Sequence, residues 1–264
     1  MFALTNDEIA SRCPAIFADT YSEARTNKYT HFNTINVIDA LRGEGFEVTN
    51  AFAQKSRSTD ANGGISHVRH CVRMSHVDYL NTLKPNDIRP EIVLVNSHNG
   101  STSFRVMAGV FRIVCSNGLI TMSDEIGESR IRHMGHTLDE VVESTLRFAA
   151  LASKENFETI EAMKTKNLSD SQQRKFAREA AMIRFWGDEK KIENYENLLN
   201  SRRHDDNLEP TVWNIFNVLQ ENCIKGGQFV GGRQMREIKG IDNQIRVNRE
   251  LWKSATDKMV ISVA

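Results

Sequence analysis

The period of the apolar residues changes once along this chain, near Thr137. Upstream of Thr137, apolar and polar residues alternate through several short segments, which is typical of half-buried strands. Downstream, apolar residues recur at helical spacing, which is typical of amphipathic helices. The sequence therefore predicts an α+β fold, with a helix and an antiparallel β-meander in the N-terminal half and a helical C-terminal half. We divide the chain into residues 1–136 and 137–264, a division that is also compatible with one compact domain.

Turn signals separate the predicted strands. Asn99-Gly100 predicts a type I′ hairpin turn, because both residues tolerate positive φ, and Asn117-Gly118 predicts a second turn. A helix with Thr34 as its N-cap precedes the first strand, and Gly43 and Gly45 end this helix. The strands are expected at residues 46–57, 65–74, 92–95, 103–115, 119–122 and 129–133, with a loop over 81–90.

Capping signals mark the helices of the second half. Thr137 with Glu140, and Ser169 with Gln172, have the spacing of capping boxes. Pro210 is placed to start a further helix. The stretch between the last two of these helices, residues 188–209, is polar and charged, which favours a mobile connection.

Composition excludes several classes of protein. The 34 Lys and Arg residues balance the 34 Asp and Glu residues, so a histone-like mode of wrapping nucleic acid is excluded, although a local basic surface is not. No apolar run approaches the ~20 residues of a membrane-spanning helix, and the N-terminus lacks a secretory signal. Four scattered cysteines without a CxxC pair indicate reduced thiols. We therefore expect a cytoplasmic protein without a membrane partner.

The histidines and cysteines do not predict a metal or catalytic site. His67 and His70 would point to opposite faces of one strand, so both cannot bind one ion there. Cys71 and Cys115 lie within strands, where cysteine is usually a small buried apolar residue. Neighbouring His76 and His98 do not change this interpretation. We expect no metal, no cofactor and no catalytic residue.

Basic residues on the predicted sheet are a stronger signal. Arg69 and Arg73 lie two pleats apart on one face of their strand, and Lys55 and Arg57 leave the preceding strand on its polar side. If these strands pair, the cations converge on one exposed face, where they and Arg105 could bind a phosphate backbone. The alternative interpretation is an ordinary solvated face.

A Gly-rich basic loop, residues 225–240, is the second signal. Between Lys225 and Lys253 there are seven Lys or Arg residues and three acidic residues. The five glycines of the loop would allow backbone N–H groups to approach an anion. The alternative is a floppy surface hairpin. The expected contacts are Lys225, Arg233, Arg236 and Lys239 to phosphates and Phe229 to bases.

Three separated blocks carry a resemblance to a known family. Residues Thr34–Phe46 (TINVIDALRGEGF), Glu91–Leu119 (EIVLVNSHNGSTSFRVMAGVFRIVCSNGL) and Gly240–Trp252 (GIDNQIRVNRELW) resemble the YfjQ/YafZ/YubP-like family of prophage and plasmid proteins. The resemblance implies a protein of a phage or other mobile element in a bacterial host. It implies no catalytic residue, because the family has no assigned activity.

A second resemblance concerns only the order of the elements. A helix, paired strands, a meander and a long helix are similar to the core of single-strand annealing proteins of the Redβ/RecT/Erf type. This resemblance implies binding along a basic groove and assembly into homo-oligomers.

The sequence thus favours a non-catalytic protein that binds nucleic acid, with single-stranded DNA as the expected partner. One alternative is an anti-defence protein that binds a host protein, which the acidic helix residues Asp139, Glu140 and Glu143 would suit. Another is a metal-dependent nuclease that uses an acidic cluster of Asp124, Glu125 and Glu128.

Overall fold

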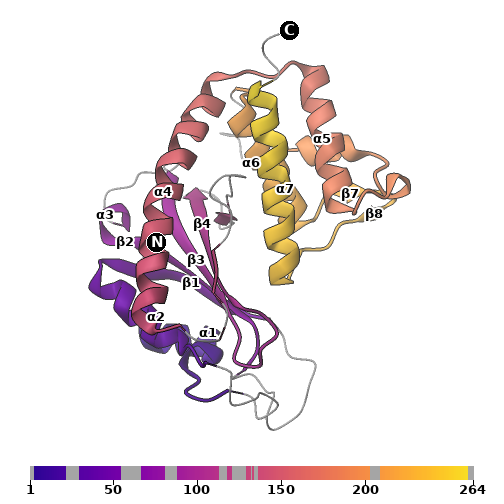
Figure 1. The fold of residues 1–264 in the computed structure, drawn as a ribbon. Coiled ribbons are helices and arrows are strands. Elements are labelled where there is room, and N and C mark those ends of the chain that lie inside the picture. Colours follow the sequence, from indigo (N-terminus) through magenta and orange to yellow (C-terminus); the bar gives the residue numbers. More distant parts are fainter. Residues whose placement is uncertain are drawn as a thin grey trace. The chain divides into compact units, whose positions relative to one another are not determined.

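The chain divides into two compact units, Met1–Ser153 and Lys154–Ala264. The computed structural model describes residues 3–21, 30–54, 67–80, 88–112, 118–120, 129–131, 133, 136–202 and 209–260 (Figure 1). The division falls inside α4 (Leu138–Thr165), whereas the sequence places the change of periodicity at the start of this helix.

An antiparallel sheet dominates the first unit, as the sequence predicts. Strands β1 to β4 are neighbours in chain order, and β5 and β6 both pair with β4, so the sheet is a meander (Figure 1). The strands are β1 (Phe46–Ala53), β2 (His70–His76), β3 (Ile88–Asn96), β4 (Phe104–Arg112), β5 (Gly118–Ile120) and β6 (Ser129–Ile131).

Short helices precede and interrupt the sheet. They are α1 (Asn6–Arg12), the 3-10 helix η1 (Pro14–Phe17), α2 (Thr34–Gly43) and α3 (Val77–Leu80). The N-cap of α2 is Asn33, whose side chain accepts a hydrogen bond from the N–H of Ile35, so the prediction of Thr34 as the cap is wrong by one residue. The Thr34 hydroxyl instead contacts His70 on β2.

One face of the sheet packs against these helices to form the core of the first unit. Alternate strand residues such as Val72 and Leu94 belong to one apolar cluster with Val37 and Leu41 of α2 and Val141 of α4. Each buried aliphatic side chain of this size stabilises the fold by about 1.5–3 kcal/mol. The core therefore fixes which strand residues point toward the opposite face of the sheet.

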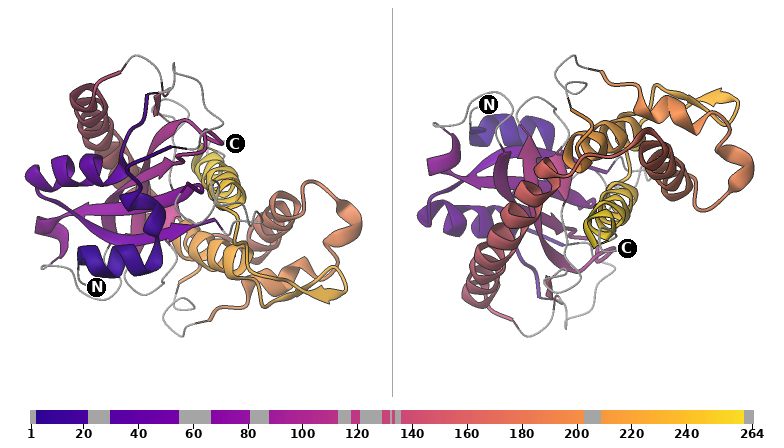
Figure 2. Two further views of the ribbon diagram at one scale, coloured as in Figure 1. Left: turned by 90° about the horizontal axis from the view of Figure 1, so that it is seen from below. Right: turned by 90° about the horizontal axis from the view of Figure 1, so that it is seen from above.

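Besides the C-terminal part of α4, the described residues of the second unit form chiefly the helices α5, α6 and α7 and a small hairpin. Helices α5, α6 and α7 pack on one another around buried Phe176, Phe216 and Trp252 (Figure 2). The capping boxes predicted at Thr137 and Ser169 are both present. The elements are α5 (Asp170–Arg184), the 3-10 helices η2 (Glu189–Lys191) and η3 (Tyr195–Leu199), α6 (Val212–Lys225), β7 (Phe229–Val230), β8 (Arg233–Gln234) and α7 (Ile241–Val260).

The connection between α5 and α6 is more ordered than its polar composition indicates. Leu198 of η3 is fully buried, Ile192 is nearly so, and η3 packs against both α5 and α6. The prediction of a mobile connection is wrong for the described residues of 188–209, because two apolar side chains are enough to attach them to the helices. No helix within the described ranges is long and apolar enough to cross a membrane.

Candidate nucleic-acid interface

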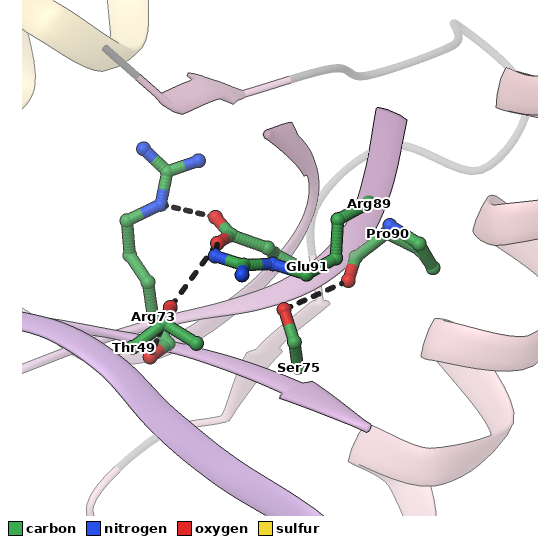
Figure 3. A network of polar contacts seen from close by, with 6 residues as sticks. All are labelled: Thr49, Arg73, Ser75, Arg89, Pro90 and Glu91. Carbon is green, nitrogen blue, oxygen red and sulfur yellow. Dashed lines mark hydrogen bonds and ion pairs between the residues drawn. The ribbon is translucent and has the colours of Figure 1, made fainter. Parts of the chain in front are cut away.

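The arginines of the sheet lie in a buried polar network and not on an exposed face. Arg73 is 7% exposed, and its Nε donates to Oε2 of Glu91 at 2.5 Å. Arg89 is 2% exposed and donates from Nη2 to the other carboxylate oxygen at 2.9 Å. The Thr49 hydroxyl also lies 3.1 Å from Glu91 Oε1 (Figure 3). The exposure that the sequence predicts for this face is therefore wrong at Arg73.

The strand register explains this network. Residues 71, 73 and 75 of β2 alternate with the core residues, and β3 places Arg89 and Glu91 on the same face as Arg73. Apolar Val93, Val95 and Met107 share that face and are fully buried. An alternating pattern shows that one face of a strand differs from the other, but it does not show that the polar face is solvated.

The other predicted sheet contacts have different surroundings. Arg69 is half-buried and donates from Nη2 to the carbonyl of Ser101 at 2.6 Å. Arg105 is 9% exposed. Lys55 and Arg57 lie outside the described residues, as do Cys115 and the acidic cluster of Asp124, Glu125 and Glu128. The Cys71 thiol is 2% exposed, and burial raises its pKa to about 12, so it is protonated at neutral pH.

Histidines from distant segments meet beside β2 and β3. His70 donates from Nδ1 to the carbonyl of Val68, so its Nε2 is the acceptor for the Thr34 hydroxyl. The Thr34 oxygen in turn accepts from the side-chain amide of Asn96. His98 lies next to His70, with ring centroids 5.1 Å apart, and its Nδ1 is 2.9 Å from Nε2 of His31.

Burial keeps these imidazoles neutral. It lowers the pKa of His70 to about 4 and that of His98 to about 3, and the neighbouring histidines lower the pKa of His98 further. A neutral His70 with the proton on Nδ1 fits every hydrogen bond made by its ring. In the part of the chain that the structure describes, no group of three or more His, Cys, Asp or Glu side chains could hold a metal ion.

The Gly-rich loop forms an ordered β-hairpin. Gly231 and Gly232 have φ of 63° and 72°, which is the pair of positive values that a type I′ turn needs. The Gly231 N–H donates to the carbonyl of Glu193, and the Asn197 side chain donates to the carbonyl of Phe229. The interpretation of this loop as a floppy surface segment is therefore wrong.

The hairpin β7–β8 and the residues that follow it, 229–239 together, are called the hairpin segment here. In this segment the apolar side chains are mostly buried and the basic side chains are exposed. Val230, Met235 and Ile238 are buried. The residues between them face solvent, and Phe229 is 54% exposed. The exposed basic residues of this segment are Arg233, Arg236 and Lys239.

The charges of this segment are not neutralised by the described parts of the chain. Arg233, Arg236 and Lys239 form no ion pair with any described residue, in contrast to Arg73 on the sheet. Lys225 differs from them, because its ammonium lies 2.6 Å from the carboxylate of Glu221. Four of the residues that the sequence predicts to contact nucleic acid thus lie in the hairpin segment. They are Phe229 and the three exposed cations.

Comparison with known proteins identifies the family. The model of the family described as Domain of unknown function (DUF932) matches residues 22–252. The chain belongs to this family. It is 32% identical over 257 residues to the UPF0380 proteins YafZ and YfjQ of Escherichia coli (strain K12), covering 96% of this chain and 90% of each relative. No solved structure matches the chain significantly.

The DUF932 match covers both units, including the hairpin and the sheet. It confirms the family that the three sequence blocks resemble. The names of the family and of the two relatives assign no activity.

Sequence reasoning missed one exposed aromatic residue near the hairpin. Trp186 follows the last turn of α5 and is 69% exposed. The nearby guanidinium of Arg184 donates to the carbonyl of Arg236, which joins the end of α5 to the segment that follows β8. The available signal was the Trp-Gly pair after the helical pattern, because Gly187 marks the end of a helix and places the preceding side chain outside it.

Proposed function

We propose that this DUF932 protein binds single-stranded nucleic acid without catalysis, through the hairpin β7–β8 and the segment that follows it. The observation that carries the proposal is the set of exposed cations at Arg233, Arg236 and Lys239, which form no ion pair with any described residue, together with the exposed ring of Phe229. Cations that are not already paired with carboxylates can neutralise phosphates and release counterions. An adjacent aromatic ring offers a surface on which a base can stack.

The hairpin suits this role better than the sheet does. To bind a phosphate, Arg73 would first have to break a buried ion pair with Glu91, which is strongly destabilising. The outward cations of the hairpin segment require no such rearrangement, because the buried Val230, Met235 and Ile238 already hold the backbone. Preorganisation of this kind reduces the entropic cost of binding.

We place this activity in the bacterial cytoplasm, in a cell that carries a phage or another mobile element. There, entering or replicating DNA is exposed as single strands. We also propose that several copies of the protein assemble along one nucleic-acid strand. Light scattering of the complex with a long oligonucleotide measures how many copies bind.

Paired charge deletions test the proposed site. We expect Arg233→Ala/Arg236→Ala to weaken binding of a labelled oligothymidylate by roughly tenfold or more at low salt, because two phosphate contacts are lost. The matched control is Arg174→Ala/Lys175→Ala, which removes two exposed charges from α5 in the same unit. Equal losses for the two variants would reject the hairpin as the site, and undetectable binding of the unmodified protein at low salt would reject the function.

A protein partner is the second candidate. Exposed Trp, Phe and Arg residues are also typical of the energetically dominant positions of protein interfaces. In that case a host protein would be recovered with the full chain in equal amounts after nuclease treatment, and Arg233→Ala/Arg236→Ala would abolish its recovery. The acidic residues Asp139, Glu140 and Glu143 are exposed on α4, but Glu140 already accepts the Thr137 N–H and Glu143 pairs with Arg147.

A further inference from the structure

The exposed indole of Trp186 is held in an uncommon backbone conformation. Trp186 has φ of 59°, in the left-handed region that bulky residues rarely adopt. Trp186 lies at the end of α5, which finishes in a Schellman motif. The N–H of Trp186 donates to the carbonyl of Ile183, and the N–H of Gly187 donates to the carbonyl of Met182. Glycine usually takes this position, because a residue with a Cβ atom is strained there. The fold therefore tolerates backbone strain at the residue that carries this exposed indole.

One face of the indole is covered by a fixed cation. The guanidinium carbon of Arg246 on α7 lies 3.6 Å from the ring centroid of Trp186. Arg246 is itself held by hydrogen bonds to the carbonyl of Ile183 and to the carboxylate of Glu250. Because 69% of Trp186 remains exposed, the face opposite Arg246 is open to solvent.

A second arginine links the helix end that precedes this indole to the hairpin segment. Arg184, two residues before Trp186, donates to the carbonyl of Arg236 in the hairpin segment. Burial lowers the pKa of Arg184, and the neighbouring guanidinium groups of Arg246 and Arg233 lower it further. The Arg184 hydrogen bond thus joins the end of α5, just before Trp186, to the hairpin segment that carries Arg233 and Arg236.

We propose that the open face of Trp186, opposite the Arg246 guanidinium, is a stacking site for one nucleobase of a bound single strand. This inference rests on the proposed function and adds a site that the hairpin alone does not supply. A planar nucleobase suits the open indole face, because every base has a π face that can stack on an aromatic ring, and the Arg246 guanidinium lies against the other face of the indole. The phosphates next to the stacked base would then meet the positive field of Arg233.

The chain offers a variant that removes the ring while relieving the strain. Trp186→Gly eliminates the stacking surface and places the residue that prefers positive φ at this position. We therefore expect the variant to unfold in urea at the same or a higher midpoint than the unmodified protein. A change in binding can then be attributed to the lost ring.

The experiment compares an oligothymidylate with an abasic oligomer of the same length. Fluorescence anisotropy of the labelled oligomers gives both affinities for the full chain and for Trp186→Gly. We expect the unmodified protein to prefer the oligomer with bases, and the variant to lose about tenfold of this preference, because stacking of one base on an aromatic ring accounts for that order of affinity and stacking on Phe229 is retained. Affinity for the abasic oligomer should be the same in both proteins.

Tryptophan emission gives a second measurement. Trp213 and Trp252 are 4% and 2% exposed, so quenching by unlabelled oligothymidylate should come from Trp186 and disappear in Trp186→Gly. If both proteins show the same preference for bases and no quenching occurs, the stacking site is rejected while the proposed function stands. If the unmodified protein binds neither oligomer, the proposed function fails.

Discussion

At the scale of single residues, Glu91 has the most consequential surroundings in the first unit. Its carboxylate is 1% exposed and accepts from Arg73 and Arg89, whose side chains are 8% and 2% exposed. We expect Glu91→Gln to lower the free energy of unfolding by about 3–5 kcal/mol, because it leaves buried guanidinium groups without their carboxylate. Urea denaturation followed by circular dichroism measures this loss.

Thr49→Val is the control for that measurement. The valine removes only a hydroxyl that hydrogen-bonds within the same network, so we expect a cost of about 1 kcal/mol. A Glu91→Gln protein as stable as Thr49→Val would contradict the description of this network as charge-dependent.

The buried histidines predict a dependence of stability on pH. The pKa values of His70 and His98, about 4 and about 3, lie below the ordinary value near 6.5 because both rings are buried. As the pH falls below about 6.5, the unfolded chain binds protons that the folded chain does not, so the free energy of unfolding decreases. We expect His70 alone to contribute a loss of about 2 kcal/mol between about pH 7 and pH 5.

A histidine variant separates this effect from general acid sensitivity. His98→Gln should reduce the pH dependence of the urea midpoint, because it removes one of the buried rings whose pKa is lowered. A urea midpoint that stays constant between about pH 7 and pH 5 would show that these rings are not buried and neutral in solution.

At the scale of elements, the hairpin β7–β8 depends on two glycines that differ in their surroundings. A Cβ atom on Gly231 would overlap the carbonyl of Lys191, whereas a Cβ atom on Gly232 would meet nothing within 4 Å. Both residues have positive φ, so each substitution by alanine costs on the order of 1 kcal/mol in backbone strain. Gly231→Ala must in addition displace the hairpin from η2.

We therefore expect Gly231→Ala to weaken oligonucleotide binding severalfold and Gly232→Ala to change it by less than about twofold. Anisotropy titrations of both variants measure this, and urea midpoints show the accompanying loss of stability. A larger loss of binding for Gly232→Ala would place the important backbone contact elsewhere in the turn.

The sequence predicts most elements because local signals agree with the fold. The capping box at Ser169 and Gln172 forms as expected, since it needs only residues three positions apart. The Asn99-Gly100 turn is predicted only in part. Gly100 has positive φ, but Asn99 does not, because its side chain accepts the N–H of Ser101 and the buried Ser97 and His98 lengthen the loop.

Strand ends and faces depend on contacts with distant residues. Pro90 is expected in a loop but lies within β3. Its carbonyl accepts from Ser75 of β2, beyond the last backbone pair between these strands, so the missing N–H interrupts no ladder. Likewise, the alternation of side chains along β2 predicts which face carries Arg73. It does not predict that Glu91 of the neighbouring strand β3 pairs with the guanidinium and so offsets the cost of burying its charge.

At the scale of the whole molecule, zero net charge hides a local imbalance. Arg233, Arg236 and Lys239 are predicted from sequence because they are close in the chain and few acids lie among them. The contact between Trp186 and Arg246 could not be predicted in this way, since Trp186 follows the end of α5, Arg246 lies on α7, and the two side chains meet only after the helices pack. The same reason applies to the cluster of His31, His70 and His98.

The salt dependence of single-strand binding tests the central proposal most directly. The logarithm of the affinity for an oligothymidylate is measured against the logarithm of the salt concentration for the unmodified protein and for Arg233→Ala/Arg236→Ala. Each lost phosphate contact should reduce the slope by about 0.7, so we predict a decrease of roughly 1.4 for the double variant. Identical slopes for the two proteins would contradict the assignment of phosphate contacts to this hairpin segment.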